Sequence, residues 1–126
     1  MPRTRAAMTF RTVRAIGLKL PGVEESTMYG TPALKLGGRM IACVASHKSA
    51  EPGTLAVRTD LEQRDMLIAE DPDTYYVKDH YRSFPVVLVR LSRVNADAIR
   101  DLLAAAHRLV SAEKHKKKRR RSTAGA

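Results

Sequence analysis

Two consecutive glycines, Gly37 and Gly38, limit the fold of this chain more than any other local feature. They separate the apolar run Ala33–Leu36 from a second run, Met40–Val44. Two-residue turns between antiparallel strands need positive φ angles, which glycine adopts without steric cost. The pattern therefore predicts a tight β-hairpin and, with it, antiparallel strand pairing.

Helical patterns stand at both ends of the folded region. Apolar residues recur at spacings of three and four over residues 9–20, with Thr9 as a candidate N-cap and Pro21-Gly22 as the end of the helix. Asn95 is expected to cap the last helix, whose apolar stripe stops near Ala112, where a run of charge begins. We expect this stripe to pack against the sheet.

The middle of the chain alternates between strand-like and helical patterns. Asp60 is expected to cap a helix that runs to about Glu70. Strands are expected at Leu55–Arg58, Tyr75–Val77 and Phe84–Leu91, the last two separated by a polar segment, residues 78–83. The order is then one helix, three or four strands, a helix, two strands and a helix. This predicts an α+β fold in which helices pack on an antiparallel sheet.

The charge of the chain is concentrated at its ends. The 126 residues carry a formal charge of +10, yet residues 15–112 sum to zero. Residues 113–121 hold one acid, Glu113, and seven cations: Lys114, Lys116, Lys117, Lys118, Arg119, Arg120 and Arg121. We therefore expect one folded domain over residues 1–112 and a disordered basic tail over residues 113–126. Three readings of the tail are open: an electrostatic arm for nucleic acid, a solubilising terminus, or a ligand of anionic membranes or acidic proteins.

No sequence pattern supports catalysis or a cofactor. Cys43 is the only cysteine and lies in an apolar run, which favours a buried hydrophobe over a reactive thiol. The four histidines lack metal-ligand spacing, and the glycines match no phosphate-binding loop. We expect a non-enzymatic protein without metal or cofactor. The densest polar cluster, residues 79–82, is expected to be a recognition loop, because Tyr81 offers a stacking face and Arg82 a phosphate-binding fork.

The composition favours a soluble protein of a reducing compartment. The arginine-rich N-terminal residues do not resemble a signal peptide, and no apolar stretch approaches the roughly 20 residues that cross a bilayer. We expect a cytoplasmic protein that does not bind membranes. The sequence leaves the oligomeric state open, with a monomer favoured.

Two segments resemble the bacterial MmcQ/YjbR-like family. The first runs from Leu20-Pro21-Gly22-Val23-Glu24-Glu25-Ser26 through Tyr29-Gly30-Thr31-Pro32-Ala33-Leu34-Lys35 to Gly38-Arg39-Met40. The second is Asp79-His80-Tyr81-Arg82 followed by Pro85-Val86-Val87-Leu88-Val89-Arg90-Leu91. The resemblance spans roughly residues 10–110, which is nearly all of the expected domain.

The resemblance implies a small α+β domain, related in shape to secretion-chaperone folds, that binds DNA through a double wing of hairpins. By position, the wing residues are Lys35 and Arg39 beside the glycine hairpin, and His80, Tyr81 and Arg82 in the second loop. We expect weak DNA binding with little sequence preference, in which the tail cations hold the duplex. Two alternatives are open: a protein-interaction module that accepts a peptide, and a small-molecule site or enzyme near Tyr29, Thr31 and His80.

Overall fold

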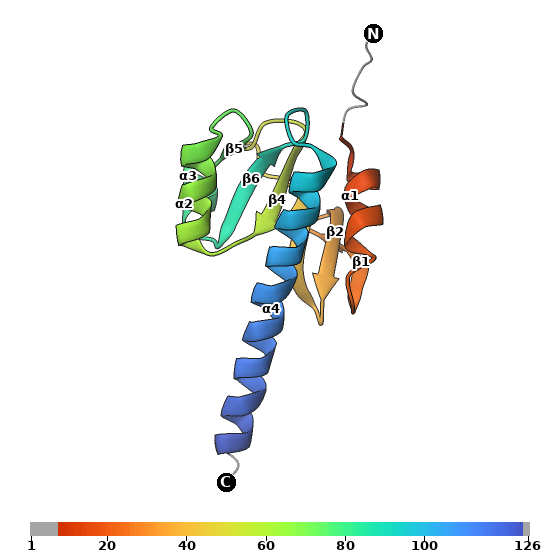
Figure 1. The fold of residues 1–126 in the computed structure, drawn as a ribbon, viewed down its shortest axis with the longest axis vertical. Helices are drawn as coiled ribbons and strands as arrows, with labels where there is room; N and C mark the ends of the chain where they lie inside the picture. Colours follow the sequence, from red (N-terminus) through yellow and green to blue (C-terminus); the bar gives the residue numbers. More distant parts are fainter. Residues whose placement is uncertain (1–7, 125–126) are drawn as a thin grey trace.

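The computed structural model describes residues 8–124, with side chains as far as Glu113 (Figure 1). The elements follow in the order α1 (Phe10–Gly17), β1 (Val23–Met28), β2 (Thr31–Leu36), β3 (Arg39–Val44), β4 (Thr54–Arg58), α2 (Leu61–Glu70), β5 (Tyr75–Tyr76), α3 (Asp79–Arg82), β6 (Val86–Arg90) and α4 (Ala96–Ala124). The prediction of an α+β fold with an antiparallel sheet is confirmed.

A single six-stranded sheet has the order β1-β2-β3-β4-β6-β5, and every neighbouring pair is antiparallel. The predicted glycine hairpin joins β2 to β3, with φ angles of 58° at Gly37 and 81° at Gly38. A second two-residue turn, Tyr29-Gly30, joins β1 to β2. The register shifts between Leu34 and Lys35, which indicates a β-bulge in the hairpin.

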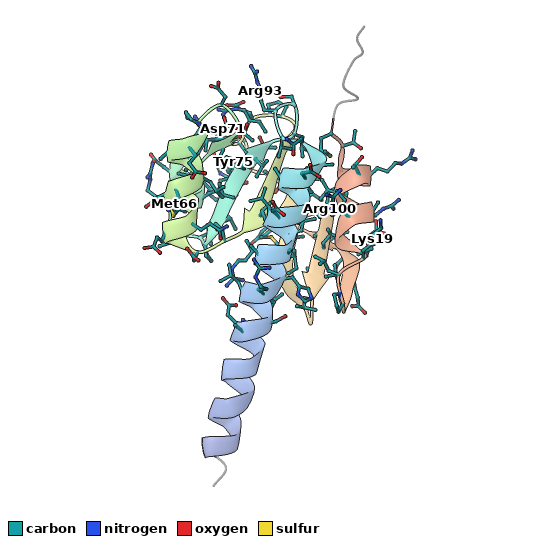
Figure 2. All side chains as sticks on the ribbon, in the orientation of Figure 1. Lys19, Met66, Asp71, Tyr75, Arg93 and Arg100 are labelled. Atoms are coloured by element: carbon teal, nitrogen blue, oxygen red, sulfur yellow. The ribbon has the colours of Figure 1, made fainter. Side chains whose placement is uncertain are left out.

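Helices α1, α2 and α4 cover one face of the sheet (Figure 1). Leu34 of β2, Leu55 of β4 and Leu103 of α4 are fully buried in the core between them. Tyr75 of β5 joins the same core beside α2 (Figure 2). The apolar stripe predicted for the last helix is therefore the side that packs on the sheet.

The predicted helix starts are largely confirmed. Asp60 accepts a hydrogen bond from the backbone N–H of Gln63 at 2.7 Å, and Asn95 accepts one from the N–H of Ala98 at 2.8 Å. Each bond satisfies a donor that the first turn of a helix leaves free. Thr9 occupies the N-cap position of α1, but its side chain makes no capping hydrogen bond.

Two boundaries differ from the sequence predictions. The expected polar loop at residues 78–83 contains the one-turn helix α3, which four residues are too few to reveal by periodicity. The last helix was predicted to end near Ala112, and this is wrong, because the α4 backbone continues to Ala124. Residues 113–124 contain neither glycine nor proline, and lysine and arginine are good helix formers. The disorder predicted for residues 113–126 in solution stays a prediction, and residues 125–126 lie outside the described range.

Within residues 8–124, no helix combines the length and the apolar character that crossing a membrane requires.

Candidate functional site

The face of the sheet opposite α1, α2 and α4 carries a second, smaller apolar cluster. Ala33, Cys43 and Ala56 lie near its middle on β2, β3 and β4, and Tyr76 and Leu88 complete it on β5 and β6. Alternation along each strand sends these side chains away from the helices. Because the side chains of Cys43 and Ala56 are small, this face is hollow above them.

The hollow is a groove with a volume of about 710 Å³. Cys43 and Ala56 belong to its floor, Met28 and Met40 line it from β1 and β3, and α3 with the start of β6 supplies another wall. Burial raises the pKa of the Cys43 thiol to about 11, so this side chain is a neutral thiol at physiological pH. The burial predicted for Cys43 is confirmed.

Two tyrosines hold the loop that follows β3 over this face. The N–H of His47 donates to the Tyr81 hydroxyl at 3.2 Å, and the N–H of Glu51 donates to the Tyr76 hydroxyl at 2.9 Å. Arg90 donates twice to the Glu51 carboxylate, at 2.9 and 2.7 Å, and stacks over the Tyr76 ring. This hydrogen bonding lowers the pKa of Glu51 and fixes the loop that borders the groove.

Arg64 holds the wall of the groove that α3 and the start of β6 form. Its side chain on α2 is only 6% exposed, and Nη1 donates to the carbonyl oxygens of Arg82, Phe84 and Val86 at 3.2, 3.1 and 3.4 Å. These carbonyls extend from the end of α3 to the start of β6, and the link between the two elements includes the groove residues Phe84 and Pro85. A buried guanidinium thus positions a wall of the site rather than a ligand.

Two histidines form a stacked pair in the groove lining. The rings of His47 and His80 lie 3.6 Å apart between centroids, with an angle of 8° between their planes. The N–H of Ser49 donates to His47 Nδ1 at 3.0 Å, so Nδ1 is the unprotonated nitrogen of a neutral ring. Desolvation, followed by the neighbouring charges of His80 and Lys48, lowers the pKa of His47.

An exposed aromatic residue stands on each side of the groove. Tyr29 is 82% exposed at the β1–β2 turn, and Phe84 is 48% exposed before β6. Tyr29 also has a φ of 52°, a left-handed conformation that is costly for a residue with a bulky side chain. Both side chains leave much of their apolar surface exposed to water in the folded protein, and both line the groove, where a ligand would contact them.

The wing residues predicted from the resemblance are dispersed. Arg39, His80 and Tyr81 line the groove, whereas Lys35 and Arg82 do not. Arg39 donates to Glu113 at 3.1 Å and Arg82 lies 3.5 Å from Asp79, so both predicted cations have acidic partners. The side chains of the tail cations, residues 114–121, lie outside the described part of the chain.

Of the three residues expected near a pocket, two line the groove. Tyr29 and His80, expected near a pocket, both line the groove. Thr31 does not, because its hydroxyl donates to the carbonyl oxygens of Met28 and Val44 at 2.9 and 2.8 Å. Two groove residues, Arg58 and His47, were not predicted, and neither was Arg64, which holds a wall of the groove. No local pattern marks any of them.

The arrangement is suited to binding an apolar group that carries negative charge. Its floor is apolar. The basic side chains of the lining, among the described residues, are Arg39, Arg58, His47 and His80. Among the described residues, no aspartate or glutamate lines the groove. Pockets with an apolar lining and a few polar groups that set orientation are typical ligand sites.

Replacing Arg64 tests how the wall is held. Arg64→Met keeps the length of the side chain but removes the guanidinium donor from the three carbonyl oxygens. We expect the free energy of unfolding to fall by about 2 kcal/mol, the scale of losing charged hydrogen bonds at buried acceptors. Urea unfolding measures it, with Arg108→Met on the exposed side of α4 as the control. Equal stability of the Arg64 and Arg108 variants would contradict the role assigned to Arg64.

The lowered pKa of His47 predicts a pH dependence of stability. Unfolding returns His47 to an ordinary pKa of about 6.5, so below this pH the unfolded state binds the proton more readily than the folded state. The stability that neutral His47 confers is fully present above about pH 6.5. It declines as the pH falls toward the pKa of His47 in the folded protein. His47→Asn retains an acceptor for Ser49 but does not titrate. We expect melting temperatures from pH 8 to 5 to fall less in this variant; parallel curves would refute the prediction.

Comparisons with known proteins identify the fold. A family model described as YjbR matches residues 18–109. The crystal structure of a Deinococcus radiodurans protein with a DUF419 domain is similar, with a TM-score of 0.67 and 24% sequence identity over 83% of this chain and 80% of that chain. At this identity, the likeness supports the fold alone. A search of curated proteins gave no match.

Proposed function

The chain belongs to the YjbR family, and on that premise we propose that it is a non-enzymatic interaction module that binds a peptide segment of a partner protein in the groove. The observation that carries the proposal is the apolar hollow of about 710 Å³ on the sheet face that α1, α2 and α4 leave uncovered. Sites of this size commonly hold ligands of several hundred daltons, which corresponds to a few amino-acid side chains.

The position of the aromatic residues supports a peptide as the occupant. Tyr29 and Phe84 stand at the groove with large exposed surfaces, and aromatic residues of this kind dominate the energetics of protein interfaces. The strained φ of Tyr29 costs stability in the free protein. A contact made with a partner would explain why the turn has tyrosine where asparagine or glycine is favoured.

The fixed borders of the groove support binding without a large rearrangement. Tyr76, Tyr81 and Arg90 hold the loop after β3, while Arg64 holds the link into β6. Both borders are therefore ordered before a ligand arrives. A preorganised site loses less conformational entropy on binding than a flexible one.

The test begins with a library of random heptapeptides displayed on phage and selected on the full chain. Selected peptides are synthesised with a fluorophore, and their affinities are measured by fluorescence anisotropy. Ala56→Phe fills the floor of the groove, and Ala15→Phe makes the same change on the exposed side of α1. We expect the first variant to weaken binding by about tenfold or more and the second by less than about twofold, because only the first occupies the site.

Cys43 gives an independent report on the position of the peptide. It is the sole cysteine and lines the groove, so a bound peptide should slow its modification by methyl methanethiosulfonate. Melting curves establish that both variants are folded. The proposed function is refuted if no peptide can be selected. It is also refuted if Ala56→Phe and Ala15→Phe bind the peptide equally and the peptide does not protect Cys43.

DNA binding through the basic end of α4 is a second candidate function. The observation in its favour is that the α4 backbone continues as helix through residues 114–121, which hold seven cations and no acid. Figure 1 shows this part of α4 extending beyond the sheet. In this proposal the extension contacts phosphates, with Lys35, Arg39, His80, Tyr81 and Arg82 as the candidate secondary contacts.

A salt titration of DNA binding tests this second candidate. If the cations cover about four to six phosphates, the slope of log affinity against log salt should be roughly −4 to −5. Replacing all seven with glutamine should remove most of the slope, whereas Ala56→Phe should leave it unchanged. Scrambled duplexes should bind within about threefold of one another, because phosphate contacts carry no base information. An unchanged slope in the glutamine variant would exclude the extension as the DNA-binding element.

A further inference from the structure

One end of the groove contains an arginine pair whose positive charges meet a single acid from α4. Arg39 begins β3 and Arg58 ends β4, and both line the groove. Arg39 Nη1 donates to Glu113 Oε1 at 3.1 Å, and Arg58 Nη2 donates to Glu113 Oε2. Glu113 itself does not belong to the groove lining. One carboxylate thus bridges two guanidinium groups from outside the site.

The bridge leaves part of the arginine pair unsatisfied. The Nε of Arg58 is buried, and it has no hydrogen-bond acceptor among the described residues. Buried polar groups in folded proteins are nearly always paired, so this unsatisfied donor indicates that the contact with Glu113 does not use every hydrogen bond that the Arg58 guanidinium can make. Two guanidinium groups against one carboxylate also leave one positive charge uncompensated at this end.

From this geometry we propose that the peptide carries an aspartate or glutamate whose carboxylate binds Arg39 and Arg58 in competition with Glu113. The inference rests on the proposed function and adds the chemistry of the ligand to it. Apolar side chains of the peptide lie over Cys43 and Ala56, and its acid lies at the arginine end. Charge-assisted hydrogen bonds from paired arginines are among the strongest that a carboxylate can accept.

The exchange of carboxylates is physically accessible. The side chain of Glu113 is 36% exposed, so its carboxylate can return to water when it leaves the arginine pair. The side chain of Arg58 is only 18% exposed, so its guanidinium stays at the groove. The arginines then exchange one acid for another, and the cost of leaving a guanidinium without a partner is avoided. The acidic residue that occupies this position in the free protein is therefore a competitor of the ligand.

The competition predicts that removing an acid from the protein strengthens the binding of an acidic peptide. The probes are a peptide selected on the full chain and its counterpart with each Glu or Asp replaced by Gln or Asn. Affinities are measured at about pH 8, where histidines are largely neutral. Glu113→Gln should raise the affinity of the acidic peptide by about tenfold, which is the scale of one charge-assisted hydrogen bond. The affinity of the neutral counterpart should rise by less than about twofold.

Matched variants separate this effect from a general change in charge or stability. Asp101→Asn removes one negative charge from the exposed side of the same helix and should change neither affinity by more than about twofold. Arg39→Gln should weaken binding of the acidic peptide by about tenfold. Arg93, which is labelled in Figure 2, does not line the groove, and Arg93→Gln should not weaken binding. The Arg39 variant tests the inference even if Glu113→Gln fails to fold.

The inference is refuted if the acidic and neutral peptides bind the wild-type chain equally, or if Arg39→Gln weakens both to the same degree. It is refuted equally if a folded Glu113→Gln variant binds the acidic peptide no better than wild type. These outcomes leave the groove as a peptide site. Loss of the groove-dependent binding itself, seen as equal affinities for Ala56→Phe and Ala15→Phe, would instead refute the proposed function.

Discussion

The one-sided packing of helices on the sheet is the constraint on which the rest of the structure depends. The apolar stripe of α4 contributes Leu103 and Val110 to the core, together with side chains from α1 and α2 on the same face. On the opposite face of the sheet, the described residues provide only the four-residue α3 and the loop after β3. The small side chains of Cys43 and Ala56 form the floor of this face, and a groove follows from this arrangement.

Local sequence patterns predicted the fold well because its elements depend on local chemistry. Gly37-Gly38 specifies a turn with positive φ, and Asp60 and Asn95 accept hydrogen bonds from residues three positions away. The helix α3 escaped prediction because one turn has no period to detect. The predicted end of α4 was wrong because the change from apolar to basic residues marks where burial ends. The helix itself continues wherever the residues have suitable helix propensities.

The candidate site was less accessible to prediction because its parts come together over long separations in the chain. Arg39 and Glu113 are 74 residues apart and Arg58 and Glu113 are 55 apart, so a linear count of charges cannot reveal their pairing. The same holds for Arg64, whose acceptors lie 18 to 22 residues away. Tyr29 and His80 were expected near a common pocket, and both line the groove. The lining residues that join them, such as Arg58 and His47, became visible only in three dimensions.

The central claim is that a peptide occupies the groove, and methyl NMR of the methionines tests it most directly. Met28 and Met40 line the groove from β1 and β3, while Met66 lies on α2, on the other side of the sheet (Figure 2). With 13C-methyl-labelled protein, a peptide selected on the full chain should shift the resonances of Met28 and Met40 saturably and leave that of Met66 in place. A peptide that binds without moving either groove methionine would contradict the account.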